Sequence, residues 1–343
     1  MLLSEFDYHL PGELIAQKPL PNREDSRMLA VDRSRGTYKD LSFRNFPGFI
    51  REGDVIVLNN TKVFPARLIG RSETGATIEL FLVDNIGGNV WEALARPARR
   101  LKPGKRVSFG EELSANILEG PVNGRVLAEF DHEGDLFDIL EKVGRTPLPP
   151  YIKREDGSRG ADRDRYQTVY AKETGAIAAP TAGFHFTPEI LEQVRARGAE
   201  TLEITLHVGY GTFEPVRVED ISKHSVQEER FEIGEREAEA LNAARNEGRR
   251  IVAIGTTTTR ALETCASKHG GFVSGKQTAD LTIVPGYEFR AIDALLTNFH
   301  LPCSSLLVLV STFGGHELIM KAYEHVVLER YRFYSYGDCM FVY

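Results

Sequence analysis

The sequence predicts an α/β protein that carries an inserted small β-barrel. Short strand-like segments separated by Gly and Asn turns fill residues 63–131, which is typical of a small barrel. A Pro-rich stretch at 147–150 indicates a boundary after this unit. From Thr187 onwards helices alternate with strands, the pattern of an α/β domain.

The barrel prediction depends on regularly spaced segments of β type. A short amphipathic segment at 136–143 follows them and predicts a helix before the Pro-rich boundary. The predicted strands lie at 63–70, 77–83, 90–95, 106–109, 115–118 and 124–130.

Capping signals place the elements of the second half. Thr187 can cap a helix with Pro188 at its first position, and Gly198 ends that helix before a strand at 201–208. A second helix ends at Gly248 and precedes another strand, and a run of threonines then opens a third helix. Apolar residues at helical spacing predict a last helix near the C-terminus. The second helix is predicted at 235–246 and the strand after it at 250–255. The third helix is predicted at 256–262 and the last helix at 316–331.

Composition narrows the class of protein. With 343 residues, 42% hydrophobic and 27% charged, the chain suits two globular domains. Its first 17 residues do not resemble a signal peptide, and its longest aliphatic run, 306–310, is too short for a bilayer. Cys265, Cys303 and Cys339 are scattered without CxxC spacing, which argues against disulfides and a zinc ribbon. We therefore expect a cytoplasmic protein.

The net charge of −7 requires any nucleic-acid binding to rely on local positive charge. One stretch offers it, because six cations occur between residues 96 and 106 with no acidic residue among them. A solvated basic loop would look the same in the sequence. The six candidate tRNA contacts are Arg96, Arg99, Arg100, Lys102, Lys105 and Arg106.

No GxGxxG, Walker loop, HExxH or paired CxxC indicates dinucleotide, ATP or metal chemistry. Five loops nevertheless gather polar groups at the ends of predicted strands. Ligands of open α/β sheets bind outside the carboxyl ends of the strands, so these loops are the candidate site. The loops are residues 59–61, 179–185, 207–213, 255–260 and 297–302.

Each loop also has a purely structural explanation. A lone histidine is often a hydrogen-bonded core residue. The threonines at 256–259 can simply cap a helix, although a helix N-terminus with hydroxyls can also hold an anion, with Arg260 adding charge. Gly209 and Gly211 either allow unusual backbone angles or let a ligand approach the main chain.

Several long motifs together resemble one family. The segments DYHLPGELIAQKPL, NNTKVFPARL, RTPLPPYIKR, RYQTVYA, AAPTAGFHFT, TLHVGYGTFEPV, IGTTTTRALE, DALLTNFHLP and YRFYSYGDCMF occur in this order over essentially the whole chain. They resemble the S-adenosylmethionine:tRNA ribosyltransferase-isomerase family of queuosine biosynthesis. Motifs such as PTAGFHF and TNFHLP are long and unusual in composition, so several in one order form a specific signal.

The resemblance implies an architecture and a reaction. It implies a discontinuous α/β domain, residues 1–61 and 151–343, interrupted by a β-barrel domain at 62–150. The family transfers the ribosyl part of S-adenosylmethionine to 7-aminomethyl-7-deazaguanine (preQ1) at the tRNA wobble position and rearranges it to give epoxyqueuosine. Adenine and methionine leave. S-adenosylmethionine is thus a consumed co-substrate, and we expect no cofactor, no metal, no membrane association and a monomer.

The reaction needs a base beside the sulfonium, an acid for the departing adenine and a positioned amine. Histidine suits acid–base work near neutral pH, so His185, His207 and His300 are candidates, and Asp338 could bind the amine or act as a second acid or base. Their individual roles stay open. The expected substrate-binding residues are Asn60, Thr61, Arg67, Pro180, Thr181, Gly183, Gly209, Gly211, Thr212, Thr256, Thr257, Arg260, Asn298 and Tyr336.

The chain departs from the family pattern in two places. Where the family often has two histidines, as in HKMHSE, this chain keeps His224 and has Gln227 in place of the second. We therefore assign no catalytic role to position 227. Thr258 and Thr259 stand where Ser-Val is usual, which preserves the small polar turn before Arg260.

Two other classes of function stay open at this point. A methyltransferase would also use S-adenosylmethionine, but the Gly-rich loop expected after its first strand is missing from this sequence. A non-catalytic RNA-binding barrel would account for the cations at 96–106, but not for the loops rich in histidine and threonine.

Overall fold

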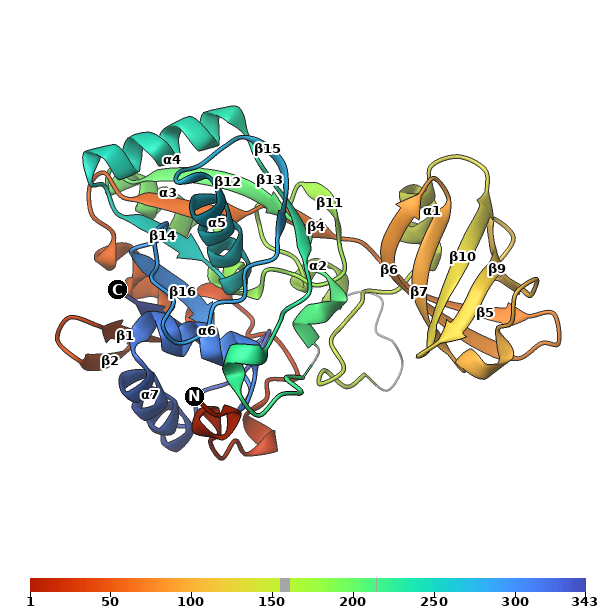
Figure 1. The fold of residues 1–343 in the computed structure, drawn as a ribbon, viewed down its shortest axis with the longest axis horizontal. Helices are drawn as coiled ribbons and strands as arrows, with labels where there is room; N and C mark the ends of the chain where they lie inside the picture. Colours follow the sequence, from red (N-terminus) through yellow and green to blue (C-terminus); the bar gives the residue numbers. More distant parts are fainter. Residues whose placement is uncertain (155–160, 214) are drawn as a thin grey trace.

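A nine-stranded mixed sheet forms the larger part of the molecule in the computed structural model, which describes residues 1–154, 161–213 and 215–343 (Figure 1). Its strand order is β15-β13-β12-β3-β14-β16-β17-β1-β2. The four neighbours β12, β3, β14 and β16 run parallel. The strands are β1 (Arg27–Asp32), β2 (Thr37–Ser42), β3 (Val55–Asn59), β12 (Glu200–Leu206), β13 (Glu229–Ile233), β14 (Ile251–Ile254), β15 (Gly275–Ala279), β16 (Ala294–Asn298) and β17 (Cys339–Val342).

Alternating side chains on the central strands build a core on each face of this sheet. Val55 and Val57 pack with α4, α5, α6 and α7, whereas Ile56 and Leu58 pack with α3 and the 3-10 helix η4 on the opposite face. Such two-sided burial is typical of parallel strands. The helices are α3 (Pro188–Ala196), α4 (Glu235–Glu247), α5 (Thr256–His269), α6 (Ser305–Gly314) and α7 (His316–Leu328).

Local signals fix the ends of most helices. Thr187 accepts a hydrogen bond from the Ile190 amide at 3.3 Å and caps α3 as predicted. Gly248, in the left-handed conformation at φ 67°, ends α4. The last helix was predicted to reach residue 331, but α7 ends at Leu328. There the chain turns through Arg330 at φ 53°, and the Tyr331 hydroxyl donates to Asp40, so tertiary contacts end the helix early.

A closed six-stranded barrel, visible to the right of the large sheet in Figure 1, holds a core of its own. The short helix α1 (Leu136–Val143) packs on it through Leu136, Ile139 and Leu140. This barrel beside the mixed sheet confirms the predicted fold class. In the order β10-β7-β6-β5-β8-β9, its strands are Arg125–His132, Val90–Arg96, Thr77–Gly87, Arg67–Ser72, Arg106–Ser108 and Leu113–Val122.

Two parallel strands, β4 (Thr61–Val63) and β11 (Glu173–Ala176), lie where the chain leaves for the barrel and returns from it. The residues before β4 supply β1, β2 and β3 to the large sheet. We propose to divide the chain accordingly into residues 62–150 and the discontinuous unit 1–61 with 151–343. In the described part of the chain, no helix is long and apolar enough to cross a membrane.

Short helices complete the secondary structure. The α-helix α2 (Ala161–Arg165) lies between the barrel and β11. The 3-10 helices are η1 (Leu3–Phe6), η2 (Gly12–Leu14), η3 (Arg23–Asp25), η4 (Phe43–Phe49), η5 (Ala98–Arg100), η6 (Thr181–His185), η7 (Tyr210–Phe213) and η8 (Ile221–Lys223).

Candidate active site

A pocket opens where parallel strands of the large sheet end. Val208 follows β12, Gly255 follows β14, and Asn298 ends β16, so three carboxyl ends supply its walls. This is the position where open α/β sheets bind ligands. We call it the central pocket. It is lined by Tyr151, Tyr166, Ala178, Ala179, Pro180, Thr181, Ala182, Val208, Gly255, Thr256, Thr257, Thr297, Asn298, Phe299, His300, Leu306, Tyr334 and Ser335.

Asn298 joins the surrounding loops through its side-chain amide. Its Oδ1 accepts a hydrogen bond from the Thr181 hydroxyl at 3.1 Å, and its Nδ2 donates to the Tyr334 carbonyl at 3.1 Å. The same Nδ2 lies 3.3 Å from Nε2 of His185. One buried amide therefore holds η6 and the C-terminal loop against the end of β16.

His185 lies behind Asn298 and does not line the central pocket. Since Asn298 donates to Nε2, the ring carries its proton on Nδ1 and donates it to the Ser26 hydroxyl at 2.7 Å. Burial first, and then Arg23 and Arg332, lower the pKa of His185 to about 3. The ring is thus neutral at physiological pH and positions Asn298.

His300 does line the pocket, directly after β16. Its Nε2 lies 3.0 Å from the Thr297 hydroxyl, and among the described residues Nδ1 has no hydrogen-bond partner. Burial lowers the pKa of His300 to about 3. The side chain is therefore a neutral imidazole in the pocket wall, able to accept a proton.

The N-terminus of α5 faces the same pocket through Thr256 and Thr257. Thr258 and Thr259 instead donate back to the carbonyls of Ile254 and Gly255, at 2.7 and 3.1 Å. The helix has Gly255 as its N-cap and no side-chain cap. Its first amides are therefore available to an anionic group of a ligand.

Tyrosines that sequence reasoning did not select form another wall. Tyr151 and Tyr334 meet edge to face with ring centroids 3.9 Å apart, and the Tyr151 hydroxyl lies 2.6 Å from that of Ser335. Burial raises the pKa of Tyr151 and of Tyr334, so both phenols stay protonated. Their only signal in the sequence was their presence in the segments RTPLPPYIKR and YRFYSYGDCMF.

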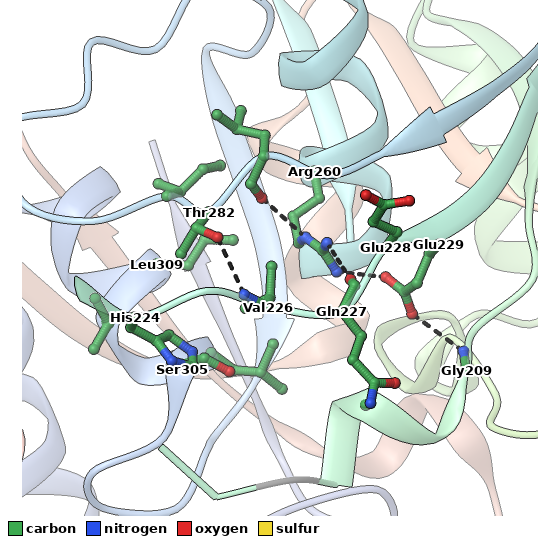
Figure 2. A pocket seen from close by; sticks show the side chains of 15 residues that line it. Gly209, His224, Val226, Gln227, Glu228, Glu229, Arg260, Thr282, Ser305 and Leu309 are labelled. Atoms are coloured by element: carbon green, nitrogen blue, oxygen red, sulfur yellow. Dashed lines mark hydrogen bonds and ion pairs between the residues drawn. The ribbon is translucent and has the colours of Figure 1, made fainter. Parts of the chain in front are cut away.

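Arg260 lies in a neighbouring pocket, which shares Leu306 with the central one. Figure 2 shows its guanidinium among protein acceptors: Nη1 donates to Glu229 at 2.5 Å, and Nη2 to the Gln227 carbonyl at 3.0 Å. Glu229 also accepts from the Gly209 amide. The buried carboxylate of Glu229 thus holds the Arg260 guanidinium beside the central pocket, whose lining includes Thr257 and His300, and substrate binding by Arg260 stays a prediction.

The same neighbouring pocket holds the Gly-rich turn after β12. Gly209 and Gly211 line it together with His224 and Gln227. A Cβ at Gly211 would lie 2.7 Å from the Gln227 side chain, so the glycine permits close packing of these two segments. Thr212 lies in η7, and its side chain is outside the described residues.

His207 is also apart from the central pocket. Its Nδ1 lies 2.8 Å from the Thr61 hydroxyl, beyond the carboxyl end of β3, and burial lowers its pKa. Asn60 accepts from the Thr205 hydroxyl at 2.7 Å and donates to Glu203. These groups connect β3 to β12, so His207 does not line the central pocket with His300, and a catalytic role for His207 stays a prediction.

Three further candidates serve as internal contacts. Both carboxylate oxygens of Asp338 accept backbone amides, from Arg27 at 2.9 Å and Arg332 at 2.8 Å, and burial raises its pKa. Gly183 packs under Tyr170, whose hydroxyl would lie 2.1 Å from a Cβ there. The Tyr336 hydroxyl donates to Asp162 at 3.0 Å. None of the three candidates lines the central pocket.

The predicted tRNA contacts are all exposed on the barrel. Lys105 and Arg106 form ion pairs with Glu73 and Asp131, at 3.5 and 2.7 Å. The other four cations form no ion pair with a described residue. Arg67, expected to bind substrate, lies instead on the barrel wall 3.6 Å from Glu79.

Within the described ranges, no group of three or more His, Cys, Asp or Glu side chains is arranged so that it could hold a metal ion.

Known proteins similar to this chain share its full length. A family model described as "Queuosine biosynthesis protein" matches residues 3–342. The S-adenosylmethionine:tRNA ribosyltransferase-isomerases of Syntrophotalea carbinolica and Symbiobacterium thermophilum are each 48% identical to it, over 344 and 345 residues that cover 100% of both chains. The crystal structure of S-adenosylmethionine tRNA ribosyltransferase from Thermotoga maritima is similar, with 34% identity and a TM-score of 0.57 over 99% of this chain and 100% of that one.

Proposed function

The chain belongs to the S-adenosylmethionine:tRNA ribosyltransferase-isomerase family of queuosine biosynthesis, and we propose its reaction from this membership. It is a tRNA-modifying enzyme that transfers and isomerises the ribosyl moiety of S-adenosylmethionine. The acceptor is preQ1 at the wobble position of tRNA, and the products are epoxyqueuosine in tRNA, adenine and methionine.

One observation carries the proposal. Three segments that resemble the family, AAPTAGFHFT, IGTTTTRALE and DALLTNFHLP, meet in the central pocket although they are far apart in the sequence. Pro180 and Thr181 come from the first, Thr256 and Thr257 from the second, and His300 from the third. Hydrogen bonds to Asn298 join the first segment to the third.

The chemistry of the pocket suits S-adenosylmethionine. Its described lining contains no Asp, Glu, Lys or Arg, so the sulfonium and the zwitterionic methionine part would meet the N-terminus of α5, polar side chains and aromatic rings there. The uncapped N-terminus of α5 can hold the carboxylate of the methionine part. Tyr151 and Tyr334 both line the pocket, and an aromatic ring attracts a cation more strongly when water is excluded.

His300 is the candidate base for the proton beside the sulfonium. Its place in the pocket wall carries this assignment. A pKa of about 3 keeps its imidazole unprotonated at physiological pH, and also makes it a weak base in the ligand-free pocket. His185 is a positioning residue, since it acts through Asn298. The protonated phenol of Tyr151 or Tyr334 can donate a hydrogen bond to the departing adenine.

The remaining assignments follow from the family and the composition. We propose that the enzyme acts in the cytoplasm as a monomer, and that it needs neither a metal nor a cofactor because S-adenosylmethionine is consumed. Barrel cations at 96–106 would contact tRNA phosphates. Four of them, Arg96, Arg99, Arg100 and Lys102, have no acidic partner among the described residues.

Product analysis tests the reaction against methyl transfer. A methyltransferase leaves S-adenosylhomocysteine, with the adenine–ribose bond intact. Ribosyl transfer breaks that bond and the sulfur–ribose bond, so adenine and methionine are expected in equal amounts. Both should depend on tRNA that carries preQ1, whose amine is the nucleophile. Chromatography that finds S-adenosylhomocysteine as the main product, or equal turnover with tRNA carrying guanine, would overturn the proposal.

A further inference from the structure

We propose that a groove between the barrel and the segment that leaves it, residues 145–154, holds the phosphate backbone of the anticodon loop, with Arg96 and Arg145 as its main cationic contacts. This inference rests on the proposed function, because it assumes that tRNA is the substrate. The groove has a volume of about 790 Å³, which is large enough for more than one nucleotide.

Strand register builds one wall of the groove. Across β5, β6 and β7, Arg67 lies opposite Phe81 and Phe81 opposite Leu94, while Glu79 lies opposite Arg96. Because residues opposite one another in antiparallel strands share a face, these side chains form two adjacent rows. All five line the groove. The barrel therefore presents these arginines on one surface, and Arg67 lies over the buried ring of Phe81.

Arg145 extends this wall from the segment that leaves the barrel. Its backbone pairs with that of Arg67 in an antiparallel bridge, with N–H···O distances of 2.8 and 3.2 Å. Like charges opposite one another destabilise such a pair unless an anion lies nearby. The carboxylate that lines the groove, that of Glu79, is 3.6 Å from Arg67 and forms no ion pair with Arg145.

The charge balance of the groove favours a polyanion. Four arginines and one glutamate line it, although the whole chain carries a net charge of −7. Arg154 is neutralised by Asp162 at 2.7 Å. Among the described residues, the guanidinium groups of Arg96 and Arg145 form neither ion pairs nor hydrogen bonds. Grooves that bind single-stranded nucleic acid combine such cations with rings on which bases stack.

The groove meets the central pocket at two places along the chain. Tyr151 lines the pocket and its neighbour Ile152 lines the groove. Val208 likewise lines the pocket, and Tyr210 lines the groove, where its ring contacts Phe81 at 5.9 Å. An RNA backbone held in the groove can therefore present one nucleoside to the central pocket, as modification of a single base requires.

The test uses the full-length enzyme and tRNA carrying preQ1. Adenine release gives kcat and KM, and filter binding between 50 and 200 mM salt gives the salt dependence of the affinity. In the variant R96Q/R145Q, we expect KM for tRNA to rise about tenfold for each arginine that no longer binds a phosphate. We expect the slope of log K against log salt to fall by about 0.7 for each of these phosphates. KM for S-adenosylmethionine and kcat at saturating tRNA should stay unchanged.

The matched control, R197Q/R236Q, removes the same charge from two exposed arginines outside the groove. Equal effects in both double variants would overturn the groove and leave only a general electrostatic effect. R145K should keep the salt slope. If thermal unfolding shows that R145Q destabilises the fold, the test uses R96Q alone, with the same measurements of KM for tRNA and of the salt slope. A wild-type enzyme that releases no adenine with modified tRNA would refute the proposed function instead of the groove.

Discussion

The side-chain amide of Asn298 donates to Nε2 of His185 at 3.3 Å, which places one predicted catalytic histidine behind the pocket wall while His300 lies in it. The three candidate histidines should therefore differ in kinetics. His300→Ala removes the candidate base and should lower kcat by about 10²- to 10⁴-fold. His185→Ala should act more weakly, through Asn298.

His207→Ala is the internal control, because His207 contacts Thr61 outside the central pocket. Single-turnover adenine release, measured with saturating tRNA, ranks the three variants. Near-wild-type turnover by H300A would exclude His300 as the base. A loss in H207A as large as that in H300A would mean that the active site extends to the end of β3.

The two buried histidines should make stability depend on pH. Their pKa values are about 3 in the folded state, against 6.5 for the free side chain. Below pH 6.5 the unfolded chain therefore binds more protons than the folded one, so stability falls as the pH falls. Each histidine contributes about 1.4 kcal/mol per pH unit in this window. Thermal unfolding between pH 7.5 and 5 measures the effect.

In H185Q one of these groups is absent, so the dependence should weaken by the contribution of about one proton. Most carboxylates titrate below pH 5, so a change in stability above that pH comes mainly from histidines. A melting temperature that stays constant from pH 7.5 to 5 would show that His185 and His300 protonate in the folded protein.

Arg260 should matter for stability more than for substrate binding. It is buried with Glu229, so Arg260→Ala leaves a carboxylate in the interior without its cation and should cost about 3–5 kcal/mol. Thr257→Ala, at the open end of α5, should instead raise KM for S-adenosylmethionine with little change in unfolding. Urea unfolding and kinetics of both variants separate the two roles. A stable R260A with a raised KM would assign Arg260 to the substrate.

The basic helix on the barrel should contribute to tRNA affinity. Arg99 and Arg100 are exposed on η5 and have no ion-pair partner among the described residues. R99Q/R100Q should weaken binding whether or not the tRNA carries preQ1, and should reduce the salt slope by about 0.9 for each phosphate of a helical stem that is no longer bound. Filter binding over a salt series measures it. An unchanged salt slope would show that η5 is solvated and does not contact tRNA phosphates.

Local chemistry made much of this fold predictable. Thr187, Pro188 and Gly198 act within a few residues of one another, so the limits of α3 could be predicted from them alone. The strand β17 was not predicted. It pairs with β1, about 300 positions earlier, and no local pattern marks that pairing.

The candidate site was predictable to a similar extent. Thr257 and His300 were found because strand ends meet at one edge of a parallel sheet. Tyr151 and Tyr334 come from loops whose positions depend on tertiary packing, so their place in two family-like segments did not single them out. The ion pair of Arg260 could not be predicted from its own segment, because its partner Glu229 belongs to another strand.

The bridge between Arg67 and Arg145 brings together the two points where the chain crosses to and from the barrel. The two ends of the remaining chain that connect to the barrel are therefore close together, whatever the size of the unit between them. A unit attached in this way can be gained, lost or exchanged during evolution without changing the strand order of the sheet that holds the pocket. The division that we propose for the chain would therefore let the sheet that holds the pocket and the barrel diversify separately.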